Sequence, residues 1–467
     1  MTLLATPAVS AAAEEALPVF NPYTGDEIGR VAPASPDEVG AVIARARTAA
    51  DAFRFSVPAE RRALLNRLAE LLTAEAESLA QTVCAEVGKT ITEARNEMRR
   101  AANTLRLSGD AATFLDGEVL HCGIVEGGVD RHAVTTCEPV GVVAAITPFN
   151  YPVNLLCHKL GPALAAGNAV IVKPSPKAPL AAARLVELCT EAGMPDGLVQ
   201  VIQGGAETAI ALTRGPIDLL SFTGGPHAGR ALKAASGLVR CLMELGGNDP
   251  LFVMPDADLE AAAHTAVAQR FEIAGQSCAA VKKLYVHAAV AEDFTEILMA
   301  RVQRVALGNP ADEATEMGPV IDAEAATGVQ ARIESAILDG AVLRAGGRIR
   351  DARFAPTLLT GVPAGTRLFA EETFGPVLAM RSFSDPDTAL AEVNASPYGL
   401  QAGVFTNDHA LIRKLTRELR VGGVMVNEGP DFRAEHVPFG GVKTSGLGRE
   451  GVRIALREMS ETKVVID

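Results

Sequence analysis

The chain has 467 residues, and because one hydrophobic core stops growing at about 250–300 residues, two or three domains are expected. Hydrophobic residues make up 48% and charged residues 21%, an ordinary globular balance. Lys and Arg number 43 against 56 Asp and Glu, and the resulting net charge of −13 argues against broad binding to nucleic acid or anionic membranes. The net charge does not exclude a small basic pocket.

Cysteine usage and the N-terminus favour a reducing cytoplasm. The seven cysteines are scattered and form no C-x-x-C pair, so neither a disulfide framework nor a metal site is expected. No Lys or Arg precedes Arg30, so the positive region of a signal peptide is missing. No apolar run approaches the roughly 18 residues that a membrane span needs.

The N-terminal part is predicted to be helical after a short beginning. Residues 1–35 contain NPYTGDEIG, whose Pro and Gly are typical of a turn between short strands. Apolar residues then recur at three- and four-residue spacing, which predicts helices over 37–53, 60–83 and 90–115.

From Thr135 onward, short apolar runs alternate with helical segments. The runs that predict strands are 141–149, 169–175, 198–204, 218–224 and 240–247, with helical segments over 154–166, 180–193 and 229–237. From about Asp249 the alternation recurs, with strands expected over 250–254, 282–287, 376–383, 402–406 and 422–427 and helices over 259–269, 292–305, 326–340 and 409–419. Such alternation implies right-handed βαβ units and parallel sheets covered on both faces.

Two residues could take part in catalysis, one as a nucleophile and one as a general base. Cys278 lies in AGQSCAAVKK beside Gly275, where a turn could expose a nucleophilic thiolate. Glu244 ends a strand-like run before two glycines and could act as a general base with a raised pKa. Taken alone, a buried inert cysteine and a surface glutamate are at least as common, so both interpretations stay open on these residues alone.

Three further positions could bind a cofactor or an oxyanion. SFTGGPHAG places Gly224, Gly225 and Gly229 between a strand and a helix, where a backbone can approach a phosphate, although the spacing is not G-x-G-x-x-G. Asn150 could donate its side-chain amide to an oxyanion, or it could simply be a turn residue beside a proline. Lys173 could meet a ribose or phosphate, and a solvated loop lysine is the alternative.

Taken together, these segments resemble the aldehyde dehydrogenase superfamily over nearly the whole chain. The matching segments, in the family's order and spacing, are TPFN, AAGNAVIVKPS, FTGGPHAG, ELGGNDP, GQSC, EETFGPV, SPYGLQAGVFT and PFGGVKTSGLGREG. The resemblance implies an α/β fold with a Rossmann-type cofactor domain, an α/β catalytic domain and a small β oligomerisation flap. It also overturns the alternative interpretations of the candidate residues.

The resemblance assigns roles to individual residues. Cys278 would be the nucleophile and Glu244 the base, with Asn150 and the backbone N–H of Cys278 as oxyanion donors. The residues expected to bind NAD or NADP are Thr147, Pro148, Lys173, Ser175, Pro176, Thr223, Gly224, Gly225, Gly229, Leu245, Glu372 and Phe374. Among these, Lys173 would contact the adenosine ribose, Gly225 the pyrophosphate and Glu372 the nicotinamide ribose, with Phe374 packing beside the nicotinamide.

The implied reaction is oxidation of an aldehyde to a carboxylate. The thiolate attacks the aldehyde, a hydride leaves to the cofactor, and Glu244 activates the water that hydrolyses the thioester. Members that pass the acyl group to coenzyme A generally lack this carboxylate, so its presence favours hydrolysis. The alternatives are an acyl-transferring relative and a non-catalytic cofactor-binding protein of the same fold.

Two positions depart from the family pattern. After VKPS many NAD-preferring members carry Glu, which repels a 2′-phosphate, whereas this chain has Pro176 followed by Lys177. Nothing in that loop excludes NADP, and Lys177 could favour it. Ile273 stands where Asn is frequent, which we interpret as altered packing behind the cysteine.

The C-terminal segment PFGGVKTSGLGREG resembles the branch that contains lactaldehyde, non-phosphorylating glyceraldehyde-3-phosphate and phosphonoacetaldehyde dehydrogenases. We therefore expect a small anionic aldehyde carrying a phosphonate or phosphate, with a neutral aliphatic or hydroxy-aldehyde as the alternative. The residues expected to bind the substrate are Arg106, His158, Ser277 and Arg433, with His436 as a further candidate. The serine at position 277 argues against the anionic interpretation, because some phospho-aldehyde members carry a basic residue there.

The predicted domains follow from the same resemblance. Residues 1–115 and 136–245 would form the cofactor domain, 246–433 the catalytic domain, and 434–453 a return segment. Residues 116–135 with 454–467 would form the flap, whose unpaired edge strand favours a homodimer or homotetramer.

Overall fold

The computed structural model describes residues 16–467. Residues 1–15 lie outside the described residues. They include most of the N-terminal segment in which we found no signal-peptide pattern, and the beginning of the predicted cofactor domain. Across the described part of the chain, no helix combines the length and apolar character needed to cross a bilayer.

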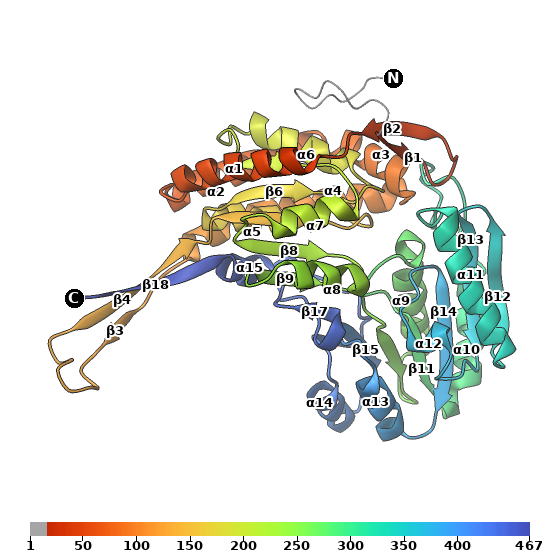
Figure 1. Cartoon of the computed structure of the whole chain (residues 1–467). Coiled ribbons are helices and arrows are strands. Elements are labelled where there is room, and N and C mark those ends of the chain that lie inside the picture. Colours follow the sequence, from red (N-terminus) through yellow and green to blue (C-terminus); the bar gives the residue numbers. More distant parts are fainter. Residues whose placement is uncertain (1–15) are drawn as a thin grey trace.

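The first large sheet among residues 16–467 has six strands and is parallel except at one edge (Figure 1). Its order is β17 (Gly446–Leu447), β9 (Arg240–Glu244), β8 (Leu219–Thr223), β5 (Val142–Ile146), β6 (Ala169–Lys173) and β7 (Val199–Val201). β5, β6 and β8 are buried along their whole length, so both faces must be covered.

Helices cover this sheet in layers. Those that contact its strands are α1 (Pro36–Phe53), α5 (Asn154–Ala166), α6 (Leu180–Glu191) and α7 (Ala206–Arg214), and α8 (Pro226–Ala235) contacts α7. Outside or beside them lie α2 (Pro58–Ala74), α3 (Ala76–Val87), α4 (Ile91–Ala111) and α15 (Val452–Glu458). Every residue of α5 is buried, because α2 and α4 pack on the side that faces away from the sheet.

The predicted helix over 60–83 is two helices in the structure. The chain breaks at Glu75, whose backbone leaves the helical region at φ −98° and ψ 11°. The Glu75 carboxylate accepts hydrogen bonds from Arg184 of α6. A tertiary ion pair at this position thus accompanies the break in a continuous helical pattern.

The second large sheet within the described residues has seven strands and is parallel except for β12. Its order is β12 (Val342–Arg350), β13 (Arg353–Thr360), β14 (Val377–Phe383), β11 (Lys283–His287), β10 (Pro250–Val253), β15 (Gln401–Phe405) and β16 (Gly423–Val426). Its helices are α9 (Leu259–Phe271), α10 (Ala291–Val302), α11 (Ala323–Leu338), α12 (Arg367–Ala370), α13 (Pro386–Ala395) and α14 (His409–Glu418). The β12–β13 hairpin escaped the sequence analysis because register shifts interrupt its alternation.

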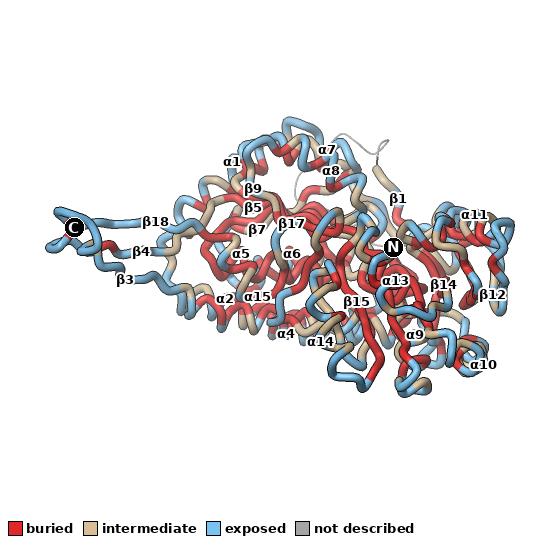
Figure 2. Tube along the Cα trace, turned by 90° about the horizontal axis from the view of Figure 1, so that it is seen from below, coloured by how far each residue is buried: buried red, intermediate tan, exposed pale blue. Residues whose placement is uncertain are grey.

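A three-stranded antiparallel sheet projects from the body of the molecule (Figure 1). It contains β3 (Val119–His121), β4 (His132–Pro139) and β18 (Ser460–Ile466), and most of its residues are exposed (Figure 2). The short pair β1 (Leu17–Phe20) and β2 (Glu27–Val31) lies near α3. Short 3₁₀ turns cover η1 (Ala112–Phe114), η2 (Glu272–Gly275), η3 (Ala288–Val290) and η4 (Lys443–Ser445).

The buried apolar side chains form two large cores, one around each large sheet (Figure 2). This architecture confirms the predicted α/β fold with parallel sheets. The exact domain boundaries stay predictions. The predicted flap ended at residue 135 and resumed at 454, whereas strand β4 continues to Pro139 and residues 454–458 belong to α15.

Candidate active site

A cleft opens where several strands of the six-stranded sheet end. The carboxyl ends of parallel strands meet at one edge, and ligands of open α/β sheets bind there. The cleft has a volume of about 590 Å³. The predicted residues that line it are Thr147, Pro148, Asn150, Lys173, Ser175, Pro176, Thr223, Gly224, Gly225, Glu244, Leu245, Cys278, Glu372 and Phe374. Gly229 lies in the first turn of α8, where an added Cβ would meet the Leu245 side chain at 2.6 Å.

Helix α8 directs its N-terminus toward this cleft. Its N-cap is Gly225, which offers no side-chain hydrogen bond, and Pro226 follows at the first helical position. The N–H groups of a first helical turn favour a negative charge. Lys173 is 3% exposed, and its Nζ donates to the carbonyl oxygens of Pro174 and Gly204 at 2.9 and 2.7 Å. The edge of the sheet therefore has the chemistry that a dinucleotide pyrophosphate requires.

The loop that carries Cys278 joins the second sheet to this edge. Ile273 and Ala274 adopt left-handed backbone angles with φ of 48° and 50°, and Gly275 follows at φ 74°. Asn tolerates this region better than a β-branched residue, which gives a physical reason for the frequent Asn at position 273. The Ile273 N–H donates to Glu93 Oε1 at 2.9 Å. An added Cβ at Gly275 would lie 2.3 Å from the Gly375 carbonyl oxygen, so only glycine fits there.

Asn150 and Cys278 lie on the two sides of this junction. Asn150 is 3% exposed, and its Nδ2 donates to the carbonyl oxygen of Gln276 at 2.8 Å. Burial raises the pKa of the Cys278 thiol, the charge of Lys282 lowers it, and the carboxylates of Asp431, Glu372 and Asp249 raise it further.

Glu244 ends β9 and is buried in the same cleft. Burial raises its pKa well above the usual range, and the negative charge of Glu450 raises it further, while Arg433 and Lys159 oppose the shift. Glu244 Oε2 is buried and has no hydrogen-bond partner among residues 16–467. A carboxyl group whose pKa is raised in this way is suited to act as a general base.

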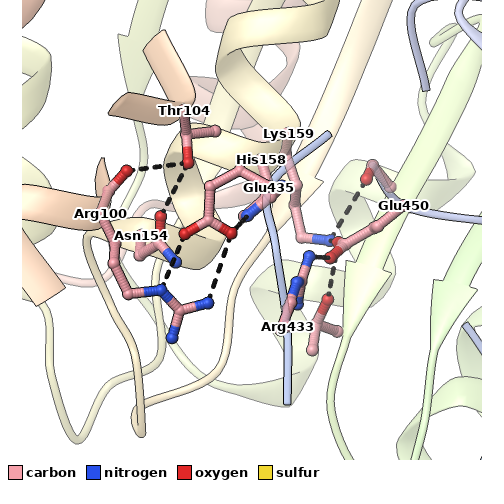
Figure 3. Close-up of polar contacts among 10 residues, drawn as sticks. Arg100, Thr104, Asn154, His158, Lys159, Arg433, Glu435 and Glu450 are labelled. Atoms are coloured by element: carbon pink, nitrogen blue, oxygen red, sulfur yellow. Dashed lines mark hydrogen bonds and ion pairs between the residues drawn. The ribbon is translucent and has the colours of Figure 1, made fainter. Parts of the chain in front are cut away.

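Figure 3 shows two groups of ion pairs, one around Glu450 and one around Glu435, whose members come from segments far apart in the sequence. Glu450 accepts hydrogen bonds from Lys159 Nζ at 2.8 Å and from Arg433 Nη2 at 2.9 Å. Glu435 accepts from Arg100 Nε at 2.7 Å, and His158 Nε2 lies 3.6 Å from it. A cavity of about 10 Å³, roughly the space of one water molecule, lies between His158, Glu244 and Glu450.

Glu372 and Phe374 enter the cleft from the segment after α12. Glu372 Oε1 accepts from the Gly247 N–H at 3.2 Å and lies 3.6 Å from Lys282 Nζ. The Phe374 ring packs edge-on against Phe149 with centroids 6.0 Å apart. Gly246 provides a close approach here, because an added Cβ would lie 2.0 Å from Glu372 Oε2.

The four residues predicted to bind substrate do not form one site, although His158 and Arg433 share a charged cluster. Arg106 is exposed on α4 and donates to Thr73 Oγ1 at 3.1 Å. His158 is buried, and burial with the charge of Arg433 lowers its pKa to about 4. Ser277 Oγ donates to Asp431 Oδ1 at 3.0 Å. Arg433 binds Glu450 and stacks over the Phe439 ring at 4.2 Å, while the nearby His436 is exposed.

Several polar residues around the nucleophile escaped the sequence analysis. Tyr151, next to Asn150, donates through its hydroxyl to Glu272 Oε1 at 3.0 Å. Asp431 is tied to Ser277, and burial together with the charge of Glu272 raises its pKa to about 7. The charge of Arg100 interacts with both Tyr151 and Glu272. Nothing in the local sequence marks Tyr151, Glu272, Asp431 or Arg100, although Tyr151 adjoins the predicted Asn150.

Lys177, the residue we considered for NADP selectivity, is paired. Its Nζ lies 2.8 Å from Asp322 Oδ2, and Asp322 also caps α11 by accepting from the Ala325 N–H at 2.7 Å. Lys177 is not among the residues that line the cleft. Its charge is therefore partly satisfied within the protein.

We expect Asp322→Asn to lower the KM for NADP by about two- to fivefold and to leave the KM for NAD unchanged. The change would free Lys177 for a 2′-phosphate, and exposed ion pairs contribute about 0.2–1 kcal/mol. Cofactor titrations under initial-rate conditions measure the effect, with Asp322→Asn combined with Lys177→Ala as the control. An equal shift for both cofactors would show that Lys177 does not discriminate between them.

A parallel sheet with a dinucleotide-type cleft, lined by a part-buried thiol and a buried carboxylate, suits a nicotinamide-dependent oxidoreductase. The family model for the aldehyde dehydrogenase family matches residues 9–465. A 3-sulfolactaldehyde dehydrogenase of Priestia aryabhattai is 41% identical over 97% of this chain and 95% of its own length. A sulfoacetaldehyde dehydrogenase of Neptuniibacter caesariensis is 42% identical over 87% of this chain and 90% of its own.

Solved structures agree. An NADP-dependent glyceraldehyde-3-phosphate dehydrogenase from Bacillus halodurans, complexed with NADP, superposes with a TM-score of 0.95 at 35% identity, covering 97% of this chain and 96% of that one. The chain belongs to the aldehyde dehydrogenase family and is an NAD(P)-dependent aldehyde dehydrogenase. This confirms the family, the enzyme class and the cofactor class predicted from the sequence.

Proposed function

We propose that this enzyme oxidises a small aldehyde to its carboxylate through a covalent intermediate on Cys278, followed by hydrolysis. The observation that carries the proposal is that Cys278, Asn150 and Glu244 line one cleft together with Glu372 and Phe374. The acyl-transferring and non-catalytic alternatives are disfavoured, because both a nucleophile and a buried base are present beside the cofactor cleft.

The residues would act in sequence. The Cys278 thiolate attacks the aldehyde carbon, and Asn150 Nδ2 with the Cys278 N–H stabilises the oxyanion, a contribution typically of about 10²–10³ in rate per donor. The bound nicotinamide supplies the hydride acceptor. Glu244 then takes a proton from water, which attacks the thioester carbonyl and releases the acid and the free thiolate.

The charged groups near Glu244 set its electrostatic surroundings and do not take up its proton. The positive charges of Lys159 and Arg433 hold the pKa of Glu450 well below its usual range, so Glu450 stays ionised and is a weak proton acceptor. The small cavity that reaches both Glu244 and Glu450 can accommodate one water. The charges of Arg433 and Lys159 also oppose the rise in the pKa of Glu244 and so favour its carboxylate form.

For the substrate we propose a small anionic aldehyde. The relatives named for 3-sulfolactaldehyde and sulfoacetaldehyde support a sulfonate, and the phosphonate or phosphate predicted from the sequence has the same charge class. Arg100 is a better candidate for the anion than Arg106, since its charge reaches Tyr151 beside Asn150, and an anion there would share its guanidinium with Glu435, to which Nε and Nη2 already donate. Asp431 and Glu272 oppose an anion in the same region, which keeps a neutral hydroxy-aldehyde as the second candidate.

The test is reduced-cofactor formation with acetaldehyde, lactaldehyde, sulfoacetaldehyde and phosphonoacetaldehyde, each with NAD and NADP. We expect Arg100→Lys to raise the KM of the anionic aldehydes about tenfold, because a lysine cannot reproduce the planar guanidinium contacts. Arg106→Ala is the matched control from the same helix and should change no KM. Activity confined to the neutral aldehydes would refute the anionic proposal, and no activity dependent on Cys278 would refute the mechanism.

We also propose assembly through the projecting sheet. Among the described strands, β18 pairs only with β4 and leaves its other edge open. Val464, Val465 and Ile466 are each more than half exposed on it. An open apolar edge strand is a template for pairing with another subunit. We therefore expect a homodimer or homotetramer, and light scattering in solution measures the mass of the assembly.

A further inference from the structure

Two buried cations connect the loop that carries Cys278 with the segment that carries Glu372. Arg270, at the end of α9, is fully buried and donates through Nη2 to the carbonyl oxygens of Thr373, at 2.9 Å, and Gly375. Lys282, four residues after Cys278, is 3% exposed. The loop of the nucleophile and the loop of the proposed ribose carboxylate are therefore packed as one unit.

The ammonium group of Lys282 has little freedom. Its Nζ donates to the carbonyl oxygen of Ser277 at 2.8 Å and to that of Cys278. An ammonium group has three donors, and the carboxylate of Glu372 lies 3.6 Å away for the third. Because leaving a buried donor unpaired is costly, the positive charge is fixed beside the backbone of the nucleophile.

The charges that face Cys278 come from several elements. Asp249 precedes β10, Glu372 follows α12 and Asp431 follows β16, and the charge of each raises the pKa of the thiol. Glu244 lines the same cleft from the end of β9. Among the groups whose charge shifts the pKa of the Cys278 thiol, Lys282 is the cation, and its charge lowers that pKa. A buried thiol surrounded by carboxylates needs such a cation to become a thiolate.

We propose that Lys282 is the positioning residue of the nucleophile. Its ammonium group fixes the backbone of Cys278, and its positive charge is shared between the Cys278 thiolate and the Glu372 carboxylate. The inference rests on the proposed roles of Cys278 and Glu372. Ribose hydroxyls that donate to Glu372 would satisfy part of its negative charge. The Lys282 ammonium would then act more strongly on the thiolate, so cofactor binding and nucleophile activation are coupled through one side chain.

The test is the pH dependence of Cys278 alkylation by iodoacetamide, followed by mass spectrometry of the peptide that contains Cys278. Measurements on the full enzyme with and without NADP give a midpoint pH independent of turnover. We expect Lys282→Met to raise the midpoint by about one unit or more, the usual effect of losing a neighbouring opposite charge. In the wild-type enzyme, NADP should lower the midpoint pH, and in Lys282→Met this downward shift should disappear. Glu372→Gln should instead lower the midpoint without cofactor.

Lys283→Met is the matched control. Lys283 is the next residue and is equally buried at 3% exposure, but its ammonium lies over the Phe369 ring at 5.5 Å. Lys283→Met should leave the midpoint pH unchanged. An equal shift in Lys282→Met and Lys283→Met would overturn the proposal, and so would an unchanged midpoint in Lys282→Met. If Lys282→Met does not fold, Lys282→Arg should keep the midpoint and Lys282→Gln should raise it. Wild-type enzyme that is not alkylated at Cys278 would refute the proposed function itself.

Discussion

A Glu244→Gln variant should release about one equivalent of reduced cofactor per active site and then nearly stop. Attack by Cys278 and hydride loss do not need this carboxylate, whereas hydrolysis of the thioester does. General-base contributions are typically about 10²–10⁴ in rate, so steady-state turnover should fall by that factor while the first turnover remains. Stopped-flow absorbance of the reduced cofactor, with the acyl-enzyme detected by intact mass, measures both phases.

The pH profile offers an independent check on the same residue. Burial and Glu450 raise the pKa of Glu244, so its basic form is gained only as the pH rises. Wild-type turnover should therefore increase with pH through this group, and the Gln variant should lose that limb. Cys278→Ser, which should show neither burst nor turnover, is the control. A full steady-state rate in the Gln variant would exclude Glu244 as the base.

Removing the Glu97 carboxylate should destabilise the enzyme by about 3–5 kcal/mol, the usual cost of breaking a buried ion pair. Lys89 and Glu97 are both fully buried, with 2.5 Å between Nζ and Oε2. Glu97 Oε1 also accepts the N–H groups of Val153 and Asn154 at 2.9 and 3.0 Å. Glu97→Ala would leave the Lys89 charge and two backbone donors without a buried partner.

Chemical denaturation monitored by circular dichroism tests this expectation. Glu97→Gln should cost less than Glu97→Ala, since the amide oxygen can still accept the two N–H groups. Glu313→Ala is the matched surface control: its carboxylate pairs with Arg95 but is 75% exposed, so the loss should stay below about 1 kcal/mol. Because the N–H groups belong to the segment just after Asn150, Glu97→Ala should also lower kcat. Equal stability of the three variants would contradict the assigned role of the buried pair.

Much of the site could be predicted because its residues stand at the ends of sequence-visible elements. Lys173, Thr223 and Glu244 are the last residues of β6, β8 and β9. Parallel strands bring their carboxyl ends to one edge, so a pattern of strands and helices places such residues in one cleft before any coordinates exist. The same reasoning reached Asn150, which follows β5, and the order of the family segments supplied Cys278 and Glu372.

The charge partners could not be predicted in this way. Arg100 and Glu435 are 335 residues apart, and Lys159 and Glu450 are 291 apart, yet each pair is in direct contact. Helical periodicity offers no reason to prefer Arg100 over Arg106 as the candidate for binding an anionic substrate.

By itself, the sequence determined the α/β class and the family, and it named Cys278, Glu244 and Asn150 as the candidate nucleophile, base and oxyanion donor, because these inferences depend on local pattern and family spacing. Only the tertiary structure decided which charges remain available to a ligand. Arg433 is paired with Glu450 and Arg100 with Glu435, burial keeps His158 neutral by lowering its pKa to about 4, and Lys282 is committed to the backbone of Cys278. The physical reason is that neutralisation of a buried charge depends on the packing of distant segments, which no local pattern encodes.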